Sequence, residues 1–455
     1  MEPFSYHVFV CDQQKPEGVP CCTARGSGSV LETLRKEIAR QGLTDVVQVT
    51  VCGSLGLCEH GPNLVVYPEG IWYSGISVDD VAEIVRSHFG EGAPIERLAR
   101  IDTQELRAEI LMNREKMQAS MRAKEAAGVL PDDLTSLIRS FQESRVILTA
   151  IELDIFTAVG AGASAGEAAI RIGADVRATG MLLNAICAMR LLRKTDGVFH
   201  NTPLSKRYFV AGSPDYARDS LMHSVNLWTR WSNLTECVKE GTAVGRTESS
   251  DRETEWTRFF IAAMNRNARE RAPWVVRAIG TEGKRRMLDV GGGSAAYTIA
   301  FCRANPALEA EVLDLPPVIG LTRQYIEQAG LTGRIKTRTA DLLSDSLGSG
   351  FDFVLVSQVC HSLSDNENFE LVKKCHSALQ PGGLLAIQEF ILEADKTAPK
   401  WSALFALNML VGTSAGSTYS EDEYVAWMKK AGFEAVRRVH LPGPSGLVLG
   451  NRPSK

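Results

Sequence analysis

One stretch of the sequence decides the fold: Leu288-Asp289-Val290-Gly291-Gly292-Gly293-Ser294-Ala295-Ala296. It runs from a short apolar strand through a glycine turn into a helix. Glycines in such a turn let the backbone bend tightly and come close to a ligand at the helix N-terminus. The spacing Gly291-x-Gly293-x-x-Ala296 also fits a dinucleotide-binding fingerprint, although this signal is weak when it stands alone.

The segments around this turn alternate between strand and helix, which indicates a parallel sheet. The predicted strands are Arg286–Val290, Ala310–Leu313, Ile335–Thr339, Phe351–Ser357, Leu384–Ile391, Glu434–Val439 and Leu447–Gly450. The predicted helices are Ala295–Arg303, Val318–Ala329, Asn366–Leu379 and Glu421–Ala431. Together they predict one doubly wound α/β domain over residues 281–455.

Three carboxylates lie at or beside the carboxyl ends of the first three strands: Asp289, Asp314 and Asp341. A carboxylate in this position can accept hydrogen bonds from ribose hydroxyls. It would repel a pyrophosphate, so the set favours a neutral or cationic nucleoside. A sulfonium cofactor that also carries an ammonium group would fit. The alternative is that the three residues only cap helices and solvate loops.

A histidine follows the fourth strand, in Ser357-Gln358-Val359-Cys360-His361. A side chain there projects into the crevice where ligands bind in such sheets. Imidazole can take a proton from a hydroxyl or thiol near neutral pH, so His361 is a candidate general base. Glu389 ends the fifth strand and is expected to orient His361, to bind substrate or to cap the next loop.

The middle of the chain is predicted to be helical. Residues 99–131 are charged and helix-like up to Gly128 and Pro131, which predicts a helical linker. Residues 132–280 predict helices with one β-hairpin, whose turn is Asp196-Gly197. Two helices and a β-wing indicate a winged helix. Because no dense Lys/Arg stripe accompanies it, a structural or dimerising role is favoured over DNA reading.

Overall composition limits the class of protein. The chain has 455 residues and a formal net charge of −4, which suits several soluble domains and argues against nucleic acid or anionic membrane as partners. No apolar run approaches the roughly 18 residues that a membrane span needs. The N-terminus resembles no signal peptide, so the predicted location is cytoplasmic.

Cysteines are concentrated at the start of the chain. Five of the ten lie within the first 58 residues: Cys11, Cys21, Cys22, Cys52 and Cys58. Without an export signal, clustered cysteines favour metal ligation over disulfides. The strand and helix patterns of residues 1–98 predict a β/α unit of about 90 residues, which is small enough to need a stabilising staple. They include a helix over residues 78–88, because Ser77 followed three residues later by Asp80 is a capping-box signal.

Residues from about 134 to 452 resemble the small-molecule O-methyltransferases of the plant-caffeate and acetylserotonin type. The matching motifs are Leu288–Gly293, Asp314-Leu315-Pro316, Ala340–Leu343, Gln358-Val359-Cys360-His361, Pro381-Gly382-Gly383, Ile387-Gln388-Glu389-Phe390, Leu407-Asn408-Met409-Leu410 and Ala431-Gly432-Phe433. The resemblance implies a Rossmann-like domain that binds S-adenosylmethionine, preceded by a winged-helix dimerisation domain. With the acidic set above, the expected cofactor residues are Asp289, Gly291, Gly293, Asp314, Asp341, Leu342 and Ser357.

The same resemblance implies that His361 is the general base and that the protein is a homodimer. Two departures stand out. Ser362 follows the histidine where plant members usually have Asp, and the family's second acidic residue is replaced by the stretch Gly416-Ser417-Thr418. The orientation of the base is therefore expected to differ from that of the plant enzymes.

Residues 1–98 resemble the thioredoxin-like [2Fe–2S] ferredoxins, whose iron ligands are four thiolates on two loops. Cys11, Cys22 and Cys58 match the family's ligands, but Ser54 stands where the third is expected. Cys52 is the expected substitute by a loop shift. The alternatives are ligation by Ser54 as an alkoxide, or loss of the cluster with the fold kept as an interaction module.

The predicted function is methyl transfer from S-adenosylmethionine to a hydroxyl of a small aromatic or ring-containing molecule, with an attached ferredoxin-like redox or docking domain and a possible redox partner protein. One alternative is a redox enzyme, of the decarboxylase or hydroxylase type, that binds the same cofactor. The other is a non-catalytic redox sensor. The expected lining of the acceptor pocket is Trp228, Trp231, Met264, Asn265, Phe405, Asn408 and Met409.

Overall fold

The structure is a computed structural model that describes residues 3–15, 19–245 and 250–454. The chain divides into two compact units, Met1–Phe141 and Gln142–Lys455. Throughout the described residues, no helix is both long enough and apolar enough to cross a membrane.

The first unit is built on a four-stranded sheet within its described residues. Its strands are β1 (Tyr6–Cys11), β2 (Val47–Cys52), β3 (Asn63–Tyr67) and β4 (Ile71–Ser74), in the order β2-β1-β3-β4. β1 runs parallel to β2 and antiparallel to β3, which is itself antiparallel to β4. The parallel pair requires a crossover, and helix α1 (Ser27–Arg40) provides it.

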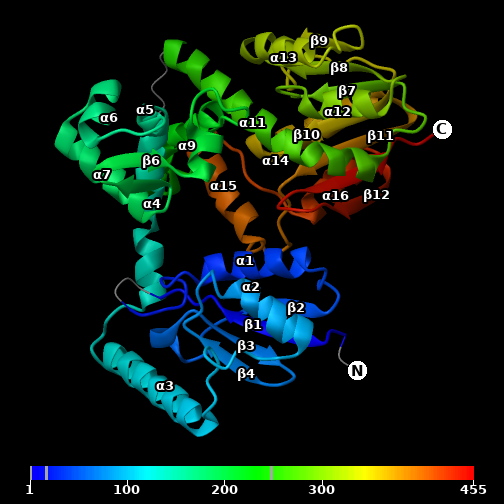
Figure 1. The fold of residues 1–455 in the computed structure, drawn as a ribbon. Coiled ribbons are helices and arrows are strands. Elements are labelled where there is room, and N and C mark those ends of the chain that lie inside the picture. Colours follow the sequence, from blue (N-terminus) through cyan, green and yellow to red (C-terminus); the bar gives the residue numbers. More distant parts are fainter. Residues whose placement is uncertain (1–2, 16–18, 246–249, 455) are drawn as a thin grey trace. The chain divides into compact units, whose positions relative to one another are not determined.

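Two further helical segments complete this unit's core. The predicted helix over residues 78–88 is observed as a short α-helix, α2 (Val81–Glu83), that continues as a π-helix, η2 (Ile84–Gly90). Asp80 accepts hydrogen bonds from the backbone and hydroxyl of Ser77, as the capping pattern predicts. Figure 1 shows α1 and α2 on one face of the sheet, where apolar side chains of both helices pack against the strands.

A long exposed helix, α3 (Thr103–Ala126), follows, and the Asp102 carboxylate caps its N-terminus by accepting from two backbone N–H groups. α4 (Asp132–Glu152) comes next and crosses the boundary between the units. The predicted helical linker, residues 99–131, contains α3.

The second unit begins with helices and one hairpin. The elements are α5 (Ile155–Val159), α6 (Ala165–Ile172), α7 (Val176–Ala188), β5 (Leu192–Thr195), β6 (Val198–Asn201), α8 (Pro203–Phe209), α9 (Arg218–Trp231), α10 (Leu234–Glu240) and α11 (Ser250–Ile279). The hairpin turns at Asp196 and Gly197, both with positive φ, as the sequence predicts. A helical pair followed by a β-wing is therefore present.

The rest of the second unit carries a seven-stranded sheet among its described residues. Its strands are β7 (Arg286–Val290), β8 (Glu309–Asp314), β9 (Ile335–Thr339), β10 (Phe351–Ser357), β11 (Leu379–Glu389), β12 (Glu434–His440) and β13 (Gly446–Asn451). The order is β12-β13-β11-β10-β7-β8-β9, and β13 runs antiparallel to both of its neighbours. Strand order reverses between β7 and β10, where open α/β sheets bind their ligands.

Helices cover both faces of this sheet, which makes it doubly wound as predicted (Figure 1). Apolar residues of α11, α12 (Ala296–Ala304) and α13 (Pro316–Gln328) pack on one face. Those of α14 (Asp365–Ala378) and α16 (Glu421–Lys430) pack on the other. Successive strand residues such as Met287 and Leu288 alternate between the two cores. α15 (Lys400–Gly412) was not expected from the sequence.

Candidate active site

The glycine turn lies at the carboxyl end of β7 and is fastened to the next strand. Gly291 and Gly293 have φ values of +68° and +56°, which side chains with a Cβ rarely adopt. The N–H of Gly291 donates to the Leu313 carbonyl at 2.8 Å, and the N–H of Gly293 donates to Asp314 Oδ2 at 2.8 Å. The turn and the end of β8 therefore form one rigid edge.

Gly292 has an ordinary φ but no room for a side chain. A Cβ built on it would lie 2.6 Å from Val312 Cγ1 and 2.8 Å from the Asp289 carboxyl. The turn thus lies directly against Asp289. Close packing therefore requires glycine at position 292, the backbone conformation favours it at Gly293, and both reasons apply at Gly291.

Asp289 is buried beneath the turn. Its Oδ2 accepts from Thr298 Oγ at 2.5 Å, whereas Oδ1 has no hydrogen-bond partner among the described residues. Burial raises the pKa of Asp289 to about 7, and the nearby Asp314 adds to the increase. An unpartnered buried carboxyl oxygen suits a ligand that brings a hydrogen-bond donor or a positive charge.

The other expected cofactor residues lie on neighbouring strands of the same edge. Asp314 ends β8, accepts from the Leu315 N–H at 2.8 Å, and has a pKa raised by burial. Asp341 and Leu342 follow β9, and Asp341 Oδ1 accepts from the Leu343 N–H at 2.8 Å. Ser357 ends β10 and donates to Gln388 Oε1 at 2.6 Å.

These four adjacent strands, β10-β7-β8-β9, thus bring the expected set to one edge of the sheet. At this edge a tight glycine turn lies beside carboxylates. None of the expected cofactor residues has a cationic side chain. That donor set fits the ribose, ammonium and sulfonium groups of S-adenosylmethionine, and it does not suit a polyphosphate.

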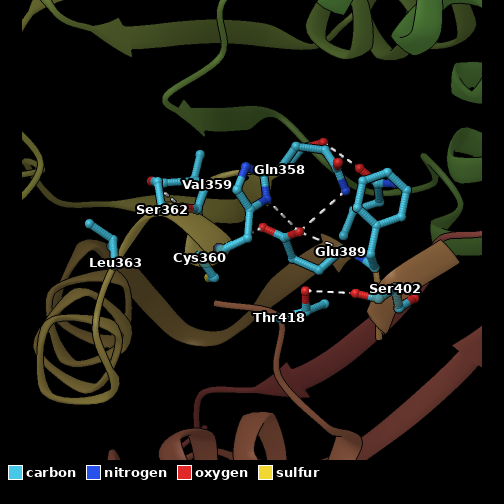
Figure 2. Close-up of polar contacts among 12 residues, drawn as sticks. Gln358, Val359, Cys360, Ser362, Leu363, Glu389, Ser402 and Thr418 are labelled. Atoms are coloured by element: carbon cyan, nitrogen blue, oxygen red, sulfur yellow. Dashed lines mark hydrogen bonds and ion pairs between the residues drawn. The ribbon is translucent and has the colours of Figure 1, made fainter. Parts of the chain in front are cut away.

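His361 lies next to this edge and contacts Glu389. Its Nδ1 is 2.9 Å from Glu389 Oε2, and its backbone N–H donates to Glu389 Oε1 at 3.3 Å. The imidazole side chain is 13% exposed and the carboxylate 1% exposed. Figure 2 shows Glu389 reaching toward the turn that follows β10. The contact suits the imidazole tautomer with its proton on Nδ1, which would leave Nε2 free to accept a proton.

The Phe405 ring and the imidazole of His361 form a T-shaped contact. Their ring centroids are 4.9 Å apart with the planes nearly perpendicular. Phe405 lies on α15, and one turn further along Asn408 Oδ1 accepts from Trp231 Nε1 at 2.9 Å. Three of the residues expected to line the pocket (Trp231, Phe405 and Asn408) are thereby connected to the base through α15.

The two departures from the plant pattern have local explanations. Ser362 donates to the Val359 carbonyl at 2.7 Å, so its hydroxyl stabilises the turn that carries His361. Gly416 packs against the backbone of the base: a Cβ there would lie 2.4 Å from the His361 carbonyl oxygen. The loop that lacks the acidic residue therefore supports His361 by close backbone packing, and Glu389 is the carboxylate that contacts the ring.

Sequence reasoning missed several residues of this site. Gln358 donates to Glu389, and Tyr297 joins Ser357 in donating to the buried Gln388. Thr298 holds Asp289. The available signals were that Gln358 is close in sequence to His361 and that Thr298 is close to the glycine turn. The sequence pattern does not show in which direction either side chain points.

The predicted [2Fe–2S] cluster has no support. Among the described residues, no group of three or more His, Cys, Asp and Glu side chains is placed to hold a metal ion. Cys52 pairs with Cys11 across parallel strands, and the Cys22 thiol forms a hydrogen bond with Cys11. Cys58 Sγ contacts Ser54 Oγ at 3.4 Å, so a hydroxyl occupies the place of one thiolate. The described residues therefore give no support to Cys11, Cys22, Cys52 and Cys58 as a joint set of iron ligands.

Asp289 makes stability depend on pH. Its pKa rises from 3.8 in the unfolded chain to about 7 in the folded protein, so folding takes up a proton between these values. Stability is therefore lost as pH rises from about 4 through 7. We expect Asp289→Asn to remove this pH-dependent contribution to the free energy of unfolding. The thermal midpoint of the variant should therefore fall less between pH 5 and pH 8 than that of the unmodified protein. Parallel curves for the two proteins would contradict the assignment.

Comparison with known proteins agrees with this geometry. An O-methyltransferase domain model matches residues 231–434, and an O-methyltransferase dimerisation domain model matches residues 135–211. The chain is 36% identical over 334 residues to 3-hydroxy-5-methyl-1-naphthoate 3-O-methyltransferase of Streptomyces sahachiroi, covering 70% of this chain and 95% of the relative.

Two further similarities point the same way. The S-adenosyl-L-methionine-dependent methyl transferase PigF of Serratia is 26% identical, over 70% of this chain and 95% of its own length. The structure of an O-methyltransferase family protein from Burkholderia thailandensis aligns with a TM-score of 0.65 at 27% identity, covering 72% of this chain and 99% of that one. The chain therefore belongs to the O-methyltransferase family and is an S-adenosylmethionine-dependent O-methyltransferase.

Proposed function

We propose that this enzyme methylates a hydroxyl group of a small aromatic molecule, with His361 as the general base. The buried contact of 2.9 Å between His361 Nδ1 and Glu389 Oε2 carries the proposal. When bound, S-adenosylmethionine would supply an electrophilic methyl group on its sulfonium, and S-adenosylhomocysteine would leave as the carbon–sulfur bond breaks. His361 Nε2 takes the hydroxyl proton as the oxygen becomes the nucleophile, and the Glu389 carboxylate stabilises the imidazolium that forms.

We assign the cofactor site to Asp289, Gly291, Gly293, Asp314, Asp341, Leu342 and Ser357. Support comes from their position on four adjacent strand ends and from the glycine turn tied to Asp314. Asp314 suits ribose hydroxyls, and Asp341 with Leu342 lies one strand further out, where the base of a nucleoside would reach. Asp289, under the turn, suits the cationic end of the cofactor.

The aromatic character of the acceptor is supported by the surroundings of the base. The Phe405 ring forms a T-shaped contact with His361, and Trp231 is held by Asn408 on the same helix. Flat rings favour edge-on and stacked contacts of this kind. The named substrate of the Streptomyces sahachiroi relative is a hydroxylated naphthoate, which fits this class.

The base assignment is tested with His361→Ala, using 3-hydroxy-5-methyl-1-naphthoate and 2-naphthol as acceptors and mass spectrometry of the methylated product. Loss of a general base is expected to lower kcat by about 10²–10⁴-fold. Affinity for S-adenosylmethionine, measured by calorimetry, should stay within about threefold because His361 lies outside the assigned cofactor set. His200→Ala, in the β-wing, is the control. Full methylation by the His361 variant would show that another group removes the proton.

We propose further that the enzyme is a homodimer. The first half of α4 presents four exposed apolar side chains at helical spacing: Leu134, Leu137, Ile138 and Phe141. Leu137 and Phe141 are 64% and 54% exposed. A continuous apolar stripe of this kind marks a protein interface, and the dimerisation-domain match begins beside it, at residue 135.

The double variant Leu137→Asp/Phe141→Asp is expected to sediment as a monomer at micromolar concentration, because two charges would be buried without partners. Val238→Asp, at an apolar residue that is 61% exposed, is the control and should remain dimeric. A dimer that survives the double substitution would place the interface elsewhere.

For residues 1–98 we propose a thioredoxin-like architecture that serves as an interaction module without an iron–sulfur cluster. The strand order β2-β1-β3-β4 with one parallel and two antiparallel pairings supports the architecture. The contact between Ser54 and Cys58 supports the absence of a cluster, since the hydroxyl replaces a thiolate.

Iron and acid-labile sulfide are therefore expected to be absent from anaerobically purified protein. Ser54→Cys restores the missing thiol, and this variant is expected to take up two irons and two sulfides on reconstitution, as four-cysteine sites do. Cys237→Ala, which removes a buried cysteine of the second unit, is a control for non-specific iron binding. Stoichiometric iron in the unmodified protein would overturn the proposal.

A further inference from the structure

Gln358 occupies a strained position directly after β10. Its φ is +57°, a left-handed conformation that glutamine rarely adopts. The backbone is held there by the sheet, since the Gln358 N–H donates to the Gln388 carbonyl at 2.9 Å. Strained backbone that the surrounding structure enforces is often found at functional sites. The turn separates Ser357 of the cofactor edge from His361.

The side chain of Gln358 reaches the carboxylate that holds the base. Its Nε2 donates to Glu389 Oε2 at 3.3 Å, the same oxygen that lies 2.9 Å from His361 Nδ1 (Figure 2). The other oxygen, Oε1, accepts from the His361 backbone N–H at 3.3 Å. Gln358 and His361 thus share one carboxylate, and both approach it from the turn after β10.

Glu389 depends on these donors because it is withdrawn from water. A buried carboxylate needs several hydrogen bonds to stay ionised. Its remaining contact, from the Phe390 N–H to Oε2, is long at 3.4 Å. Without the amide of Gln358, one side of Oε2 loses its donor, and the carboxylate gains freedom to rotate about its last bond. The His361 ring would then lose its fixed direction.

We propose that Gln358 is a positioning residue for methyl transfer: its amide fixes Glu389 Oε2, and Glu389 in turn aims His361 Nε2 at the acceptor hydroxyl. The left-handed turn is the device that brings the amide to the carboxylate. This inference rests on the proposed role of His361 as base, and it adds a residue that acts on the ring through Glu389.

Two variants separate the amide from the backbone strain. Gln358→Met keeps the length of the side chain and the strained backbone but removes the donor. Gln358→Gly removes the donor and relieves the strain. Both are expected to lower kcat by about tenfold, since misalignment of a reacting group costs rate more than binding. The KM for acceptor and the affinity for S-adenosylmethionine should change by less than about twofold. Gln380→Met, at an exposed residue of β11, is the control.

A double-mutant cycle identifies the route of the effect. In a Glu389→Gln background, Gln358→Met should cause no further loss of kcat, because the residue acts through that carboxylate. Wild-type kcat in Gln358→Met or in Gln358→Gly would overturn the inference. A loss in kcat accompanied by an equal loss in cofactor affinity and a lower thermal midpoint would also overturn it. Additive effects of the two substitutions on kcat in the cycle would do the same. If His361→Ala keeps full activity, the proposed function itself fails, and that result is distinct from these.

Discussion

The site depends on one buried hydrogen bond, between Glu389 at the end of β11 and His361 after β10. A carboxylate that is 1% exposed is costly to leave without partners, so the surrounding chain supplies it with donors. Apart from the adjacent Phe390 N–H, those donors come from the single turn after β10, which constrains the conformation of that turn. The close approach of Gly416 to the His361 carbonyl oxygen fixes the same turn from the other side.

The parallel sheet places Glu389 and His361 at the same edge as the residues that we assign to the cofactor site. β11, β10, β7, β8 and β9 are consecutive neighbours, so their carboxyl ends present Glu389, His361, the glycine turn, Asp314 and Asp341 in a row. The register of the paired strands keeps these carboxyl ends at the same height in the sheet, because Ser357 pairs with Gln388 and Asp314 pairs with Thr339. His361 thus follows the strand next to the glycine turn, so an acceptor bound beside it and a cofactor bound at the turn would be neighbours.

Much of the second half was predictable because its strands are buried on both faces and read as apolar runs between turns. The predicted bounds of β7, β9 and β10 agree with the structure. α15 was missed because its sequence is apolar on all sides and therefore lacks the one-sided pattern that marks a helix. In the first unit, the helix after Ser77 starts later than expected and continues as a π-helix, a distinction that side-chain spacing does not encode.

The residues of the candidate site also divide into those that the sequence predicts and those that it does not. His361, Glu389 and the strand-end carboxylates were predictable because topology alone places them at one edge. The burial of Asp289 was not, because it follows from the packing of Gly292 against it. Gln358 depends on a positive φ that no local pattern announces. The cysteines show the limit of motif reasoning: spacing suggested a ligand set, but among the described residues no group of such side chains is placed to hold a metal ion.

The most direct test of the central contact is the tautomer of His361, read from a nitrogen-15 spectrum of protein labelled only in its histidines. The resonance would be assigned by its absence in His361→Asn. A Glu389 carboxylate that accepts from Nδ1–H predicts a proton on Nδ1 and none on Nε2 at neutral pH. A proton on Nε2 instead would mean that Glu389 does not hold the ring as a base, and the proposed proton transfer would be contradicted.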